Sequence, residues 1–91
     1  MRPRVSAQAG TLESSDALVL VEPVAEGTGR QIELESNVML QYGRRIRQQI
    51  ALTLDRLDVA DVRILIKDKG ALDATMRARV ETALRRSSQT L

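Results

Sequence analysis

The chain has 91 residues, of which 43% are hydrophobic and 29% are charged, and its net charge at pH 7 is +2. These values are typical of a single soluble domain. The sequence has no cysteine and no histidine, so disulfides, zinc–thiolate sites and Ser–His catalytic pairs are excluded. We therefore expect neither a self-sufficient hydrolase nor a metal site, and we expect any reactive group to come from elsewhere.

Residues 1–16 have neither helical nor strand periodicity and contain several small residues. We expect them to form a flexible N-terminal arm that ends in a turn around Ser14 and Ser15. Residues 17–91 are expected to form a single α+β domain, because two kinds of hydrophobic period follow one another along this part of the chain.

Two short apolar patterns predict strands in the first half of the domain. Residues 17–21 are a run of Ala, Leu and Val that is bounded by Pro23. Residues 31–35 alternate strictly, with Ile32 and Leu34 on one face and acidic residues on the other. Because a loop with two glycines separates the two runs, we expect an antiparallel hairpin.

The hydrophobic period then changes to that of a helix. Between residues 37 and 57, apolar residues recur every three or four positions and predict one apolar stripe. The stripe comprises Met39, Tyr42, Ile46, Ile50, Leu54 and Leu57. Residues 61–67 return to alternation, which predicts a third strand, and residues 71–86 carry the stripe of a second helix.

The predicted order is therefore β-β-α-β-α, an α+β two-layer sandwich in which two helices cover a three-stranded sheet. The third strand can pair in parallel with the second strand or antiparallel with the first. The hydrophobic patterns leave both pairings open.

The candidate functional residue is a serine in the predicted turn. Ser14 and Ser15 lie between Glu13 and Asp16, and a polar cluster of this kind is most often only a solvated turn. A serine that serves as an attachment point needs an accessible hydroxyl in a loop, because the modifying enzyme supplies the base and the metal. The small neighbours of Ser14 meet that need.

Two stretches of the chain resemble one family of carrier proteins. Residues 9–14 (AGTLES), followed by Asp16, resemble the N-terminal signature of citrate lyase acyl carrier proteins, the gamma subunit. Residues 68–73 (DKGALD), continued by residues 77–79 (RAR), resemble a second stretch of the same family. The two stretches occur in the expected order and spacing, and the resemblance spans nearly the whole chain. The delta subunit of malonate decarboxylase is a related carrier that shares mainly the serine-turn region.

The resemblance implies a non-catalytic carrier with a covalent arm. In this family the serine at the position of Ser14 forms a phosphodiester with phosphoribosyl dephospho-coenzyme A, whose terminal thiol carries an acetyl group as a thioester. The alpha subunit exchanges this acetyl group for citrate and releases acetate. The beta subunit then cleaves the citryl group to oxaloacetate and restores the acetyl thioester. A prosthetic-group transferase attaches the arm, and tethering raises the local thioester concentration at both active sites.

The sequence departs from the family pattern at Ser15, where the family has glycine. Glycine adopts a positive φ at no steric cost and serine does not, so the turn here either does not need that geometry or is altered. Ser15 also offers a second hydroxyl and is kept as a minor alternative attachment site.

The second candidate segment comprises Asp68, Lys69, Gly70 and Asp73. It is interpreted as a strand exit, a turn and a helix start, or as a docking turn near the serine.

Other partners and functions follow from the same residues. We consider contacts between the arm phosphates and arginines, including Arg2 and Arg4. The expected partners are the alpha and beta subunits and the transferase, with no nucleic acid and no membrane, and the expected location is the cytoplasm.

The alternative functions are a small basic nucleic-acid-binding module, a malonate-decarboxylase-type carrier, and an assembly subunit without an arm. The first alternative is disfavoured because the predicted strands carry no aromatic residue for base stacking.

Overall fold

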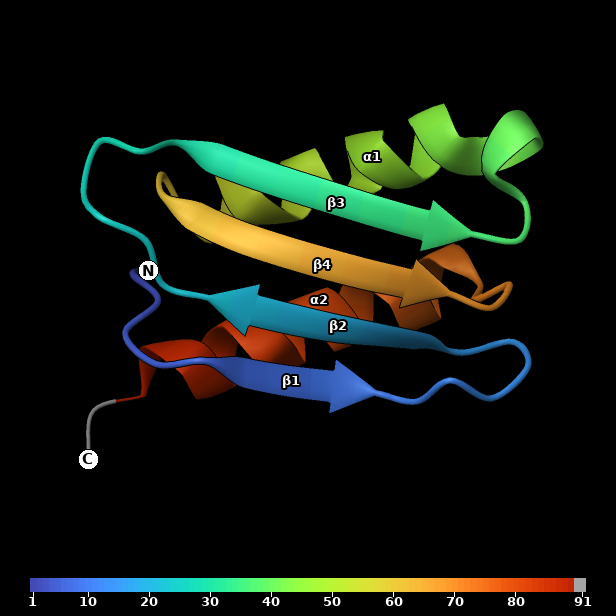
Figure 1. Cartoon of the computed structure of the whole chain (residues 1–91), viewed down its shortest axis with the longest axis horizontal. Coiled ribbons are helices and arrows are strands. Elements are labelled where there is room, and N and C mark those ends of the chain that lie inside the picture. Colours follow the sequence, from blue (N-terminus) through green and yellow to red (C-terminus); the bar gives the residue numbers. More distant parts are fainter. Residues whose placement is uncertain (90–91) are drawn as a thin grey trace.

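The computed structural model describes residues 1–89, in which strands and helices alternate in the second half of the chain. The elements are β1 (Ala7–Gly10), β2 (Ala17–Glu22), β3 (Arg30–Ser36), α1 (Met39–Arg56), β4 (Val62–Asp68) and α2 (Asp73–Ser88) (Figure 1). The predicted α+β class is confirmed. The predicted number of strands is wrong, because the described residues form one sheet of four strands.

The additional strand is β1, which lies inside the segment predicted as an arm. β1 pairs antiparallel with β2, and Ala9, opposite Val19, is buried in the core. The sequence Ala-Gln-Ala-Gly has no β-branched or aromatic residue, so its composition carries no strand signal. Tertiary contacts with β2 and α2 hold this strand instead. The division of the chain into an arm (1–16) and a carrier domain (17–91) stays a prediction.

The strand order in the sheet is β1-β2-β4-β3, which puts β4 between β2 and β3 (Figure 1). The predicted hairpin of β2 and β3 is therefore wrong. The alternate residues Val62, Ile64 and Ile66 of β4 are fully buried, which suits a central strand with a neighbour on each side. β4 runs antiparallel to β2 and parallel to β3, so both pairings that the sequence left open occur together.

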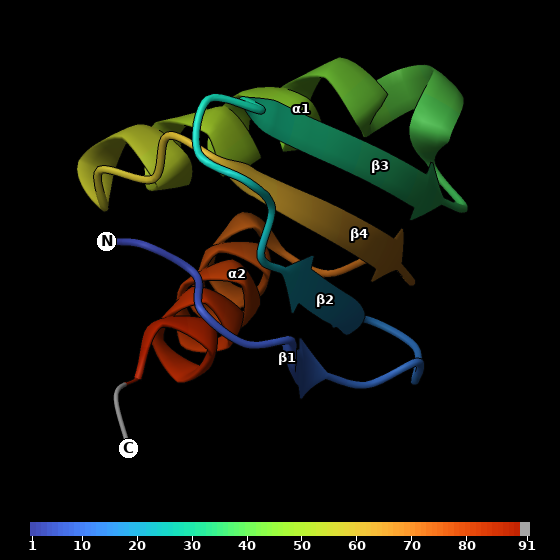
Figure 2. The ribbon, with the colours of Figure 1, turned by 60° about the vertical axis from the view of Figure 1, so that its left-hand side comes forward.

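Both helices cover the same face of the sheet, as the two-layer prediction requires (Figure 2). The opposite face carries charged residues, among which Arg63 lies within 3.6 Å of Glu22 and 3.1 Å of Glu33. No helix in the described part of the chain is long and apolar enough to cross a membrane. The largest fully buried apolar side chains, which form the core between the layers, are Val19, Val21, Ile50, Leu54, Val59, Val62, Ile64, Ile66, Val80 and Leu84.

The apolar stripe predicted for α1 is buried only in the second half of the helix. Ile50 and Leu54 are 1% and 0% exposed, whereas Met39 and Tyr42 are 37% and 49% exposed. α1 and α2 both begin at the end of the molecule where β3 and β4 end, and the β1–β2 turn lies at that same end (Figure 1). The first turns of α1 therefore leave apolar surface accessible at the end of the molecule that carries the candidate serine.

Candidate functional site

The candidate serine lies in the tight turn that joins β1 to β2. The Asp16 N–H donates to the Glu13 carbonyl over 3.2 Å, so Ser14 and Ser15 are the two central residues of the turn. Both serines are exposed. The side-chain hydrogen bonds of the turn engage Thr11 and Asp16, and none among residues 1–89 uses the Ser14 hydroxyl. The hydroxyl is therefore accessible at the tip of a well-defined turn.

Ser15 adopts the left-handed backbone conformation, with a φ of 64°. A positive φ at the third residue of a four-residue turn is characteristic of a type II turn, which favours glycine at that position. The turn thus has the geometry that favours glycine at this position, although the residue is serine. A non-glycine residue in this conformation costs about 1–2 kcal/mol.

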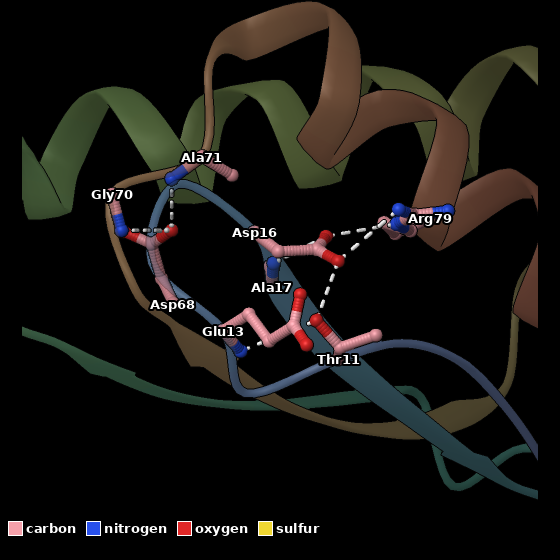
Figure 3. A network of polar contacts seen from close by, with 8 residues as sticks. All are labelled: Thr11, Glu13, Asp16, Ala17, Asp68, Gly70, Ala71 and Arg79. Atoms are coloured by element: carbon pink, nitrogen blue, oxygen red, sulfur yellow. Dashed lines mark hydrogen bonds and ion pairs between the residues drawn. The ribbon is translucent and has the colours of Figure 1, made fainter.

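Asp16 is the centre of the hydrogen-bond network that fixes the turn (Figure 3). Its two carboxylate oxygens accept hydrogen bonds from the Arg79 guanidinium over 2.9 and 3.1 Å. They also accept hydrogen bonds from the Thr11 hydroxyl and from the Ala17 N–H, both over 2.7 Å. The Thr11 hydroxyl oxygen accepts the Glu13 N–H over 3.2 Å. This single carboxylate therefore joins the turn to the start of β2 and to α2.

The electrostatics of Asp16 follow from this network. Hydrogen bonds from Arg79, Thr11 and Ala17 hold the pKa of the Asp16 carboxyl far below its ordinary range, and Arg79 contributes most. The same pairing raises the pKa of Arg79. The contacts that lower the pKa of Asp16 are the same hydrogen bonds that position the turn against β2 and α2.

The second candidate segment binds directly to the serine turn. The Ser15 N–H donates to the Lys69 carbonyl over 2.8 Å, and the Lys69 N–H donates to the Asp16 carbonyl over 2.9 Å. These bonds continue the antiparallel β2–β4 pairing, in which Ala17 is opposite Asp68, beyond the ends of both strands. The two segments that resemble the carrier family are therefore neighbours in space.

Asp68 holds the β4–α2 turn from inside the protein. The residue is only 2% exposed, and its carboxylate accepts the N–H groups of Gly70 and Ala71 over 3.1 and 2.9 Å (Figure 3). Its other oxygen accepts the Ser36 hydroxyl over 2.8 Å. Gly70 has a φ of 90°, so the turn uses the backbone freedom of glycine. The interpretation as strand exit and turn thus describes the local structure of this segment.

The remaining candidate residues lie at opposite ends of the molecule. Asp73, the first residue of α2, pairs with Arg45 of α1 over 2.6 Å at the same end of the molecule as the serine turn. Arg2 and Arg4 lie at the opposite end, where the Arg4 N–H donates to the Ser87 carbonyl over 2.8 Å (Figure 1). The hypothesis that these two arginines contact the arm phosphates gains no support from this placement.

Sequence reasoning missed the role of Arg79 as the partner of Asp16. The two residues are 63 positions apart, and no local pattern joins them. The available signal was the place of Arg79 in the second stretch that resembles the carrier family, residues 77–79.

Comparisons with known proteins agree with this geometry. A family model described as the malonate decarboxylase delta subunit matches residues 4–87, which include the serine turn and residues 68–73. The citrate lyase acyl carrier protein of Vibrio cholerae serotype O1 is 49% identical over 79 residues, which cover 87% of this chain and 80% of that protein. The protein of the same name from Klebsiella pneumoniae is 43% identical over 89 residues, which cover 98% and 91%.

A solved structure shows the same fold. One chain in the crystal structure of a Pseudomonas malonate decarboxylase hetero-tetramer in complex with malonate superimposes with a TM-score of 0.80 and 25% sequence identity. The match covers 96% of this chain and 89% of that chain. The similarity therefore extends over the sheet and both helices.

Proposed function

Because this chain belongs to the family that comprises the citrate lyase acyl carrier proteins and the malonate decarboxylase delta subunit, we propose that it is the acyl carrier subunit of a citrate lyase. In this proposal Ser14 bears phosphoribosyl dephospho-coenzyme A as a covalent arm. The observation that supports it most directly is the free, exposed Ser14 hydroxyl at the tip of a turn that Asp16 and Arg79 hold.

The chemistry of the turn fits an attachment site and not an active site. The low pKa of Asp16 leaves its carboxylate unable to take the proton from the Ser14 hydroxyl efficiently, and the chain has no histidine or cysteine. The base therefore comes from the transferase. As that base takes the hydroxyl proton, Ser14 Oγ forms a bond to phosphorus in an activated arm precursor, and the precursor's leaving group departs from the same phosphorus.

The backbone favours Ser14 over Ser15 as the attachment point. The hydrogen bonds that join the turn to the β4–α2 segment involve Ser15 and Asp16 and not Ser14. Ser15 also has a φ of 64°, a conformation that serine adopts only at an energetic cost. A transferase can thus reach the hydroxyl of Ser14 without disturbing the bonds that hold the turn.

The proposed role of the chain is tethering, and the chain itself is non-catalytic. The arm supplies a thiol that holds an acyl group as a thioester. The protein fixes the root of this arm at one point, and a short flexible tether produces effective concentrations of about millimolar at the sites that it reaches. The proposed partners are the alpha and beta subunits of citrate lyase and the prosthetic-group transferase, acting in the cytoplasm.

A second candidate function is a carrier for malonate decarboxylase. It is favoured by the description of the matching family model and by the similar chain in the malonate decarboxylase hetero-tetramer. The higher identity to citrate lyase acyl carrier proteins, 43–49% against 25%, makes citrate lyase the first choice.

The decisive experiment is intact-mass analysis of the chain after expression together with the attaching enzymes and the large subunits. We expect one added phosphoribosyl dephospho-coenzyme A, mapped to the peptide that contains Ser14. An unmodified chain in an active lyase complex contradicts the proposal.

Reconstitution separates the two candidates. Loaded carrier combined with citrate lyase alpha and beta subunits is expected to convert citrate to acetate and oxaloacetate. Activity only with malonate decarboxylase subunits and malonate favours the second candidate instead.

A further inference from the structure

A groove of about 550 Å³ lies between the beginnings of the two helices. One wall is the first half of α1 and the other is the β4–α2 segment with the start of α2. The lining that matters here comprises Val38, Tyr42, Ile46, Gly70, Ala71 and Leu72. None of the hydrogen bonds that hold the serine turn uses these side chains, so the groove has no part in stabilising that turn.

The groove displays apolar side chains that a small domain would otherwise bury. Leu72 is 75% exposed and Tyr42 is 49% exposed, and both line the same groove. Tyr42 belongs to the apolar stripe of α1, whose later members are in the core. Removal of such surface from water is favourable by about 25 cal/mol for each Å². The groove is therefore suited to a ligand with an apolar portion.

The attachment point and the groove belong to one hydrogen-bonded unit. Ser15 and Asp16 are bonded to the backbone of Lys69, and the next residue along the chain, Gly70, lines the groove. A group rooted on Ser14 thus starts beside the rim of this groove. The N-terminal segment, by contrast, lies at the far end of the molecule (Figure 1), where Arg2 and Arg4 are close to the C-terminal end of α2.

Three charged residues also line the groove, namely Arg45, Asp68 and Asp73. All of them are engaged within the protein, so the apolar side chains are the surface that the groove offers a ligand. Arg45 lines the groove and is paired with Asp73 over 2.6 Å, with 64% and 46% of the two side chains exposed. Lys69 is exposed in the segment that binds the serine turn. The buried Asp68 carboxylate already accepts hydrogen bonds from Ser36, Gly70 and Ala71, so few of its acceptor positions remain for a ligand in the groove.

We propose that this groove is the resting site of the arm: it holds the methylene and geminal methyl groups of the pantetheine portion of the coenzyme-A-like group rooted on Ser14 when the carrier is not docked on a partner enzyme. This inference rests on the proposed function. The groove need not bind tightly, because the arm is tethered at its rim. At an effective concentration of about 1 mM, an intrinsic dissociation constant of about 1 mM already gives half occupancy.

The groove contains a natural reporter for this test, because Tyr42 is the only aromatic residue of the chain. NMR spectra of the Tyr42 ring are compared between the apo and the arm-loaded carrier, each verified by intact mass. We expect the ring signals to shift on loading, and we expect nuclear Overhauser contacts between the ring protons and the geminal methyl groups of the arm.

A pair of matched variants assigns the effect to the groove. Leu72→Asp removes an apolar wall residue at the N-cap of α2, where Asp is a favoured residue, so the variant is expected to fold. Leu40→Asp changes a leucine in the first turn of α1 that is fully exposed and does not line the groove. The loading-dependent shift of Tyr42 is expected to fall by at least half in the Leu72 variant and to persist in the Leu40 variant.

Four results overturn the inference. Unchanged Tyr42 signals in a carrier whose mass shows a loaded Ser14 refute the resting site and leave the proposed function intact. A shift that grows with protein concentration assigns the groove to a second copy of the chain, and one that needs an added large subunit assigns it to that partner. A chain that stays unloaded in the presence of its attaching enzymes refutes the proposed function together with the inference.

Discussion

The turn before β2 (residues 11–16) and the loop after it (residues 23–29) both contain residues with positive φ, and an aspartate carboxylate holds each of them. In the loop the positive φ values, 86° in each case, belong to Gly27 and Gly29. The Gly29 N–H donates to Asp61 over 2.7 Å, and this backbone donor is the main reason that the pKa of Asp61 is lowered. In the turn the positive φ belongs to Ser15, and Asp16 is held by a charged side chain, Arg79.

The difference shows which of the two connections holds a strained residue. The glycines of the loop adopt a positive φ at no steric cost, and a side-chain carbon at either of them would meet open space. The turn is bonded to the β4–α2 segment through Lys69 and to α2 through Arg79, and these contacts hold a strained serine. These contacts give Ser14 a defined position relative to the β4–α2 segment and the groove that this segment lines.

The largest effect is expected from a change at Gly10, at the end of β1. A side-chain carbon at this position would overlap the carbonyl oxygen of Ala17, and φ is 92°. Gly10→Ala is therefore expected to destabilise the fold by about 3 kcal/mol or more, as measured by urea unfolding. Gly27→Ala is the matched control, since φ is 86° but no atom lies within 4 Å, and it is expected to cost only about 1–2 kcal/mol. Equal losses in the two variants would contradict the account of a tightly packed turn.

The Asp16–Arg79 pair predicts a specific dependence on pH. The pKa of Asp16 in the folded protein lies below its ordinary value of 3.8, so the unfolded chain binds the proton more readily. The stability that this pair contributes is therefore complete above about pH 5 and is lost as the pH falls below about 4. Thermal unfolding of the wild type and of Asp16→Asn is expected to differ most at neutral pH and to converge in acid. A constant difference between pH 7 and pH 3 would show that the charge of Asp16 is not what holds the turn.

The smallest effect on stability is expected at Ser15. Ser15→Gly relieves about 1–2 kcal/mol of backbone strain but adds about 0.5–1 kcal/mol of unfolded-state freedom, so a net gain of up to about 1.5 kcal/mol is expected. Ser14→Gly is the control, because φ at Ser14 is not positive and glycine there has only the entropic cost. Urea unfolding midpoints are expected to rise for the first variant and fall for the second. The opposite order would mean that the turn does not depend on the glycine geometry.

Much of the fold could be predicted from the sequence because its signals are local. The alternating patterns of β3 and β4 and the helical period of α1 lie within ten to twenty residues of chain and match the elements found. β1 and the strand order depend on contacts between distant segments, such as the pairing of Ala17 with Asp68. The hydrophobic periodicity of a segment does not indicate which distant segment it contacts. The hairpin of β2 and β3 was wrong for this reason, since β4 is the strand that lies between them.

The candidate site was predictable only in part. Ser14 was identified as a candidate through the resemblance of residues 9–14 to a carrier family. The residue types around it, taken alone, indicate only a solvated turn. The Asp16–Arg79 pair and the bond from Ser15 to Lys69 join residues more than fifty positions apart, so only the folded chain brings them together. The exposure of Met39 and Tyr42, in the first half of an apolar stripe whose second half is buried, was likewise invisible in the pattern.

The intact masses of two variants, Ser14→Ala and Ser15→Ala, show directly which serine bears the arm when each is expressed with the attaching enzymes and compared with the wild type. We expect one arm per chain in the wild type and in Ser15→Ala, and none in Ser14→Ala. Circular dichroism of each variant provides the control for folding, because both serines are exposed and neither substitution removes a core contact. An arm on Ser14→Ala, or its loss from a folded Ser15→Ala, would contradict the assignment of Ser14 as the attachment point.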